Sequence, residues 1–150
     1  MPSAVWFAPW KSGPAGAGLD DDAGDAGAGG GPGVVSVTEF VPHRPWDALG
    51  VGIAGAALRR IWHDVEGAVG LWLWTVPDLL RPRSGAVSVW RDETCLAGFV
   101  SRPDHLRIVR AYRDRGTLRS AMWRTEDFDR AATREAARAL LTGRTDWPAR

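Results

Sequence analysis

An α+β fold, with the element order βαββαβ and one added C-terminal helix, is predicted for this chain of 150 residues. Four segments are short and rich in β-branched and aromatic residues, which is typical of strands. Three further segments repeat apolar residues at helical spacing. Turns rich in proline or glycine separate the segments, and this order of strands and helices is that of a ferredoxin-like sandwich.

The beginning of the chain differs in composition from the rest. Residues 11–33 are dominated by Gly, Ala and Asp and contain almost nothing that could be buried. We therefore expect residues 1–33 to be a disordered tail and residues 34–150 to be the folded domain. The apolar residues within segment 5–10 leave open that this short piece docks against the domain.

The folded part is expected to begin with a strand and to end with a helix. The predicted strands are Val34–Val41, Val69–Val76, Ala86–Trp90 and Thr117–Arg124. The predicted helices are Trp46–Trp62, a broken helix between Asp92 and Gly116, and Asp127–Leu141. Asp92 and Glu93 favour a helix start, because carboxylates there face the positive end of the helix dipole. Thr125 or Asp127 is the expected cap of the last helix, and Gly143 is its expected stop.

The strand patterns predict a sheet that is apolar on both faces. Leu71 and Leu73 point to one face of the second strand, whereas Trp72 and Trp74 point to the other. Burying a large aromatic side chain contributes about 2–3 kcal/mol, so both faces should be covered. A homodimer that shares the tryptophan face is the simplest arrangement.

The broken helix carries the strongest candidate for a reactive group. His105, Ile108, Val109 and Tyr112 fall at i, i+3, i+4 and i+7, so they share one face. His105 is a core histidine satisfied by a carbonyl, a partly exposed residue on the helix rim, or an acid–base group near neutral pH. Tyr112, the chain's one tyrosine, is expected to line the same cavity, either as packing or as a phenol for hydrogen bonding or radical quenching.

Three tryptophans are candidates for binding a substrate. Trp72, Trp74 and Trp90 could form an aromatic wall for a flat polycyclic or polyene molecule. The alternative is that they fill the core of the dimer.

Other patterns exclude several classes of function. A net charge of +1 is too small to indicate nucleic-acid binding, and the arginines near the broken helix suit a solvated face. Gly50–Gly55 matches G-x-G-x-x-G, but a turn and a helix start separate it from the preceding strand, so we expect no dinucleotide site. Three histidines without carboxylates at ligand spacing predict no metal site.

The single cysteine, Cys95, excludes an internal disulfide and suits a reducing compartment. It is either a small buried hydrophobic residue or a thiolate activated near a helix N-terminus. No apolar run approaches the length that spans a bilayer, and residues 1–12 lack the features of a signal peptide. We therefore expect a cytoplasmic protein with no membrane partner.

One region resembles a known superfamily. It consists of Val87-Ser88-Val89-Trp90-Arg91-Asp92, then Phe99, and then His105-Leu106-Arg107. These motifs are similar to those of the dimeric α/β-barrel superfamily, which includes antibiotic-biosynthesis monooxygenases, haem-degrading monooxygenases and the spheroidene monooxygenase group. The resemblance covers most of residues 34–126 and implies a homodimer of ferredoxin-like domains. In the haem-binding branches a histidine from this region is the iron ligand, and His105 is the matching residue.

Two functional hypotheses follow. The first is a monooxygenase-like protein that oxidises an apolar polycyclic or polyene small molecule. It would use either no cofactor, with the substrate delivering electrons to oxygen, or haem held by His105. His105 and Tyr112 would then be catalytic, and Trp72, Trp74 and Trp90 would bind the substrate. The second hypothesis is a non-catalytic dimeric module that binds haem or another small molecule.

Overall fold

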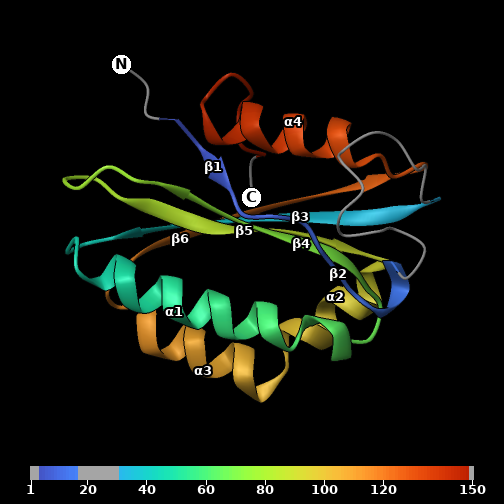
Figure 1. Ribbon diagram of the computed structural model, residues 1–150, viewed down its shortest axis with the longest axis horizontal. Helices are drawn as coiled ribbons and strands as arrows, with labels where there is room; N and C mark the ends of the chain where they lie inside the picture. Colours follow the sequence, from blue (N-terminus) through green and yellow to red (C-terminus); the bar gives the residue numbers. More distant parts are fainter. Residues whose placement is uncertain (1–3, 17–30, 149–150) are drawn as a thin grey trace.

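The computed structural model describes residues 4–16 and 31–148 as one sheet with helices on both sides (Figure 1). The four long strands are β3 (Gly33–Pro42), β4 (Ala68–Val76), β5 (Arg83–Trp90) and β6 (Gly116–Thr125). They are antiparallel in the order β4-β5-β3-β6. All four predicted strands are confirmed, and β5 begins at Arg83, three residues before the predicted start at Ala86.

The helices divide between the two faces of the sheet. One face carries α1 (Asp47–Arg60), the short 3-10 helix η2 (Trp62–Asp64), α2 (Glu93–Val100) and α3 (Pro103–Tyr112). The other carries α4 (Arg130–Leu141), as Figure 1 shows. The predicted element order, including the break between α2 and α3, is confirmed. None of the helices in the described residues is long and apolar enough to cross a membrane.

Side-chain caps set where two of these helices begin. The Asp92 side chain accepts a hydrogen bond of 2.9 Å from the backbone N–H of Cys95 and so starts α2, as predicted. Asp129 accepts the corresponding bond of 2.9 Å from the N–H of Ala132 and starts α4. The expectation of Thr125 or Asp127 as the cap is therefore wrong. β6 continues to Thr125, which keeps that residue in the sheet. Gly143, at a φ of 77°, follows the end of α4 as predicted.

The sheet is apolar on both faces, as the strand pattern predicts. Leu71 and Trp90 pack under α1–α3 with Trp62, whereas Trp72 and Trp74 pack under α4. The second face is covered by α4 within the same chain, through Phe128, Ala137, Leu140 and Leu141. Because both faces are covered within one chain, the argument for a dimer from an uncovered face no longer applies. The homodimer stays a prediction that must rest on other grounds.

The tail expected over residues 1–33 is partly an ordered component of the fold. Strands β1 (Trp6–Phe7) and β2 (Lys11–Ser12) pair antiparallel with β4, and a 3-10 helix, η1, spans Pro14–Gly16. Disorder is therefore wrong for residues 4–16, and residues 17–30 lie outside the described residues. The prediction failed because it used the average composition of the tail, whereas a few apolar side chains are enough to dock a short segment on the domain.

Trp10 is the main anchor of this segment. It is 4% exposed, and its ring centre lies 4.5 Å from that of Trp72 and 5.7 Å from that of Phe128. Gly70 on β4 permits this approach, because a Cβ there would overlap the indole of Trp10. The N-terminal segment thus completes the cover that α4 provides for the tryptophan face.

Replacing Trp10 with alanine should lower the free energy of unfolding by about 3–5 kcal/mol, since it opens a cavity between Trp72 and Phe128. Urea denaturation followed by circular dichroism measures this loss. Trp6→Ala is the matched control, because Trp6 is 62% exposed and its loss should change stability by less than about 1 kcal/mol. Equal effects of the two substitutions would show that segment 5–10 does not dock as described.

Candidate functional site

His105 lies in the first turn of α3, directly after the helix break. α2 ends at Val100, and Pro103 begins α3, a position where proline loses no helical hydrogen bond. The imidazole Nδ1 lies 3.1 Å from the backbone carbonyl oxygen of Val100. A carbonyl oxygen only accepts, so Nδ1 carries the proton in this bond and the lone pair of Nε2 is left for another partner.

Burial keeps this imidazole neutral. His105 is partly buried, and the loss of hydration lowers its pKa from the ordinary value of 6.5. The bond to Val100 and the negative charge of Asp104 oppose this effect but do not overcome it. Asp104 is itself held by Arg102, with 3.1 Å between Nε and Oδ1. A neutral imidazole with an unprotonated Nε2 has the properties of a proton acceptor at pH 7.

A cluster of three aromatic rings links His105 to the sheet. The Phe99 ring lies 4.9 Å from that of His105 and 5.0 Å from that of Trp90. Trp62 lies 5.2 Å from Trp90 and 5.4 Å from Phe99. Trp62 and Trp90 are fully buried, and the Nε1 of Trp62 has no hydrogen-bond acceptor among the described residues. The imidazole therefore sits at the outer edge of a tightly packed aromatic layer.

A hollow of about 350 Å³ opens beside this aromatic cluster. Its wall includes two apolar residues, Phe99 and Val65. It also includes the charged residues Glu66, Arg91 and Arg102. Phe99 belongs to both the hollow and the surroundings of His105. A volume near 300 Å³ is at the lower end of sites that hold small molecules.

Cys95 also lines the hollow. The structure favours a packing role for this residue over an activated thiolate. Burial raises the pKa of the thiol, and a hydrogen bond with Asp92 acts in the same direction. Arg91, whose Nη2 lies 3.4 Å from Sγ, lowers the pKa by a smaller amount. The thiol is therefore protonated at pH 7, and an activated thiolate at the start of α2 is not supported.

Tyr112 lies at the other end of α3 and does not share the surroundings of His105. Its ring centre is 6.1 Å from that of Phe40, and Gly50 of α1 packs against its hydroxyl group. The expectation of one cavity lined by both residues is wrong, because His105 contacts Phe99 and Val100 of α2, whereas Tyr112, seven residues further along α3, contacts Phe40 of β3 and Gly50 of α1. Gly50 thus permits close packing between α1 and α3. Gly55 lies against β4, because a Cβ atom built at Gly55 would be 3.6 Å from a methyl carbon of Leu73.

The three predicted tryptophans do not form one wall. Trp90 faces the His105 side of the sheet, whereas Trp72 and Trp74 face α4. Successive residues of a strand alternate between the two faces, and residues paired across neighbouring strands share a face. The register pairs Trp72 with Val87 and Trp90 with Ala68, and Val87 and Trp90 are three residues apart on β5, so they face opposite sides. A shared role of all three in binding one substrate is therefore excluded by the sheet that separates them.

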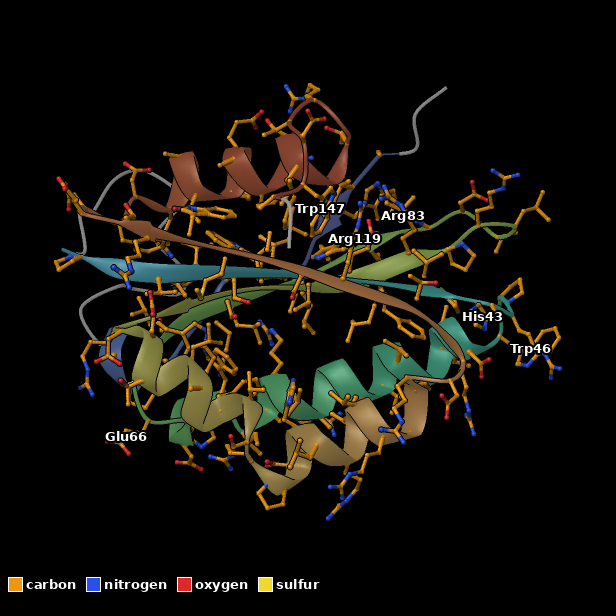
Figure 2. The ribbon with its side chains drawn as sticks, turned by 180° about the vertical axis from the view of Figure 1, so that it is seen from behind. His43, Trp46, Glu66, Arg83, Arg119 and Trp147 are labelled. Atoms are coloured by element: carbon orange, nitrogen blue, oxygen red, sulfur yellow. The ribbon has the colours of Figure 1, made fainter. Side chains whose placement is uncertain are left out.

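A polar cluster on the α4 side was missed in the sequence. Glu39 of β3 is 4% exposed, and its carboxylate is held by Arg83 at 2.6 Å and Arg119 at 2.8 Å. Arg119 also lies under the indole of Trp147, 3.9 Å from the ring centre. Figure 2 shows Arg83, Arg119 and Trp147 together between the sheet and α4, far from Glu66 on the opposite face. The sequence did contain a sign of this cluster, because Glu39 is an acidic residue at an inward-facing position of the otherwise apolar strand Val34–Val41.

Haem is one cofactor implied by the superfamily resemblance, with His105 as its ligand. The unprotonated Nε2 has suitable chemistry. The space does not suit it, because Phe99 packs on the imidazole and Trp62 and Trp90 fill the layer behind. The neighbouring hollow of about 350 Å³ does not include His105 in its wall. The residues around His105 therefore do not fit a haem group in this arrangement. No three His, Cys, Asp or Glu side chains within the described ranges could hold a metal ion.

No family model and no curated protein matches the chain, but several solved structures do. A proposed monooxygenase from Lactobacillus acidophilus is 11% identical, with a TM-score of 0.53 over 65% of this chain and 47% of its own. A conserved protein of unknown function from Bacteroides thetaiotaomicron, a candidate oxidoreductase, is 12% identical, with a TM-score of 0.52 over 61% and 97%. SnoaB, a cofactor-independent oxygenase from Streptomyces nogalater, is 22% identical, with a TM-score of 0.47 over 61% and 90%.

The chain has the ferredoxin-like α+β fold of these structures. The two structures with TM-scores above 0.5 share its ferredoxin-like α+β arrangement, and this confirms the predicted resemblance at the level of the fold. Identities of 11–12% carry no information on the substrate.

Gly50→Ala should destabilise the chain by about 1–3 kcal/mol, because the added methyl group overlaps the Tyr112 hydroxyl. In a Tyr112→Phe background the same change should be neutral or stabilising, since alanine has a helix propensity about 1 kcal/mol better than glycine. Urea unfolding of the wild type, the two single variants and the double variant gives the coupling energy between positions 50 and 112. Gly52→Ala is the control, because no atom lies within 4 Å of its Cβ position, and it should stabilise in both backgrounds.

Proposed function

We propose that this chain is a monooxygenase-like protein that oxidises an apolar polycyclic small molecule without a cofactor. The main support is the geometry of His105, whose Nδ1–H is fixed by Val100 and whose Nε2 is left unprotonated. The lowered pKa keeps the ring neutral at pH 7. The fold shared with monooxygenase-like proteins agrees with this function.

In this proposal His105 is the general base. Nε2 accepts a proton from an acidic C–H group of the substrate, and the rings of the substrate delocalise the carbanion. Because His105 is not in the wall of the hollow beside Phe99, the hollow holds only one end of the ring system, against Phe99 and Val65, and the acidic C–H group has to extend past Phe99 to reach Nε2. Arg91 and Arg102 in the same wall supply N–H donors for an oxygen atom of the substrate, while Asp92 and Asp104 balance their charges.

The substrate supplies all the electrons that the reaction needs. Its carbanion transfers one electron to O₂, and the radical and superoxide then combine to form a C–O bond. The imidazolium returns its proton to complete a hydroperoxide. Loss of the second C–H proton and cleavage of the O–O bond leave a carbonyl group and water. Overall, R₂CH₂ + O₂ gives R₂C=O + H₂O, with one oxygen atom in each product.

The remaining predicted site residues are not needed for this chemistry. Tyr112 and Trp74 lie away from His105, and Trp90 forms the packed layer behind Phe99. Catalytic or substrate-binding roles for them stay predictions. The non-catalytic alternative, a module that binds a small molecule, is supported by a larger groove on the α4 side that His105 does not reach.

Anthrone, a flat tricyclic carbon acid, is a suitable probe substrate. The protein should accelerate its conversion to anthraquinone with uptake of one O₂ per molecule. His105→Gln should reduce the protein-dependent rate by 10²- to 10⁴-fold, the usual contribution of a general base. The rate should fall as pH drops through a pKa below 6.5, because protonation removes the base.

His63→Gln is the matched control, because His63 is an exposed histidine of the 3-10 helix η2. This variant should retain the full rate. Wild-type turnover that is unchanged in His105→Gln would contradict the proposed role. Absence of any protein-dependent rate across a panel of polycyclic carbon acids would favour the non-catalytic alternative.

A further inference from the structure

A groove of about 900 Å³ lies beneath the C-terminal end of α4. Its apolar wall includes Val76, Leu80, Leu140 and Trp147, and Arg83 and Arg119 lie in the same wall. Figure 2 shows these two arginines and Trp147 gathered on the α4 side of the sheet. The sheet separates this groove from His105, so the proposed base cannot act on a molecule bound here.

Glu39 holds the two arginines in place at the base of the groove. Arg83 donates from Nη1 to Glu39 and from Nη2 to the carbonyl oxygen of Leu141 at 3.0 Å. Arg119 donates to Glu39 from Nε at 2.8 Å. The side chain of Arg119 remains 43% exposed, and a guanidinium has five N–H donors of which this bond uses one. Donors that are already oriented can bind a carboxylate with little loss of side-chain freedom.

Trp147 covers one side of Arg119 and contributes an aromatic surface to the groove. Its ring stacks on Arg119, and its Nε1 is buried without a hydrogen-bond acceptor among the described residues.

The base of the groove is locally positive. Arg83 and Arg119 share the single carboxylate of Glu39, which leaves this cluster with one positive charge in excess. Asp78, Arg81 and Asp146 also line the groove, and with them the charges of the whole lining balance, so the preference for an anion is confined to the surroundings of Arg119. Asp78 accepts hydrogen bonds from the backbone N–H groups of Leu80 and Arg81, so its carboxylate is occupied within the β4–β5 turn.

We propose that this groove binds an aromatic carboxylate, with the carboxylate on Arg119 and the ring system between Leu80, Leu140 and Trp147. The proposal does not depend on oxidation at His105. It assigns to the α4 side a binding site that is separate from the monooxygenase-like chemistry.

Isothermal titration of the full chain with 2-naphthoate tests the proposal, and 2-naphthamide serves as the uncharged comparison. We expect 2-naphthoate to bind at least tenfold more tightly than the amide. Arg119→Gln should weaken naphthoate binding at least tenfold and remove the preference. Arg107→Gln, an exposed arginine of α3 on the other side of the sheet, is the control and should change nothing.

Arg119→Gln leaves Glu39 with one partner, so its fold must be compared with wild type by circular dichroism. Leu80→Ala provides an independent variant, because Leu80 is 85% exposed and its loss does not disturb the core. It should weaken naphthoate binding about threefold or more, through lost apolar contact. The proposal is overturned if wild-type protein binds neither probe at millimolar concentration, or binds both equally. Naphthoate affinity unchanged in a folded Arg119→Gln variant would also overturn it.

Discussion

Burial of both faces of one sheet by a single chain is the constraint on which the rest of this structure depends. Consecutive residues of β4 face opposite sides, so Leu71 needs the cover of α1–α3 and Trp72 needs that of α4. Trp10 completes the second cover from the N-terminal segment. Each face is therefore covered by a different part of the chain (Figure 1). The hollows on the two faces share no lining residue and are chemically independent.

This separation decides which residues can act together. His105 acts with Phe99 and with the small hollow beside it, because all three lie on the α1–α3 side. α2 ends at Val100, so the carbonyl oxygen of Val100 receives no hydrogen bond from a following turn of that helix. The imidazole of His105 donates to this oxygen instead. A local interruption of the helix thus sets the proton position on the histidine. The arginine pair on Glu39 belongs to the other side and serves a different purpose.

The sequence predicted the elements well because their signals are local. Strand and helix positions follow from periodicity, and the alternation of Leu71, Trp72 and Leu73 correctly assigned each residue to a face. The same alternation cannot say what covers a face, so a partner chain was expected where α4 lies. Grouping Trp90 with Trp72 required the strand register, which periodicity does not contain. Glu39 was missed because its two arginines come from strands 44 and 80 residues away in the sequence.

The central functional claim is that His105 is a neutral base with its proton on Nδ1. Long-range ¹H–¹⁵N NMR correlations of imidazole nitrogens, recorded against pH and assigned with His105→Gln, measure this directly. The account predicts a protonated Nδ1 and an unprotonated Nε2 at pH 7, with a pKa below 6.5. A proton on Nε2 at pH 7, or a pKa above 6.5, would contradict it.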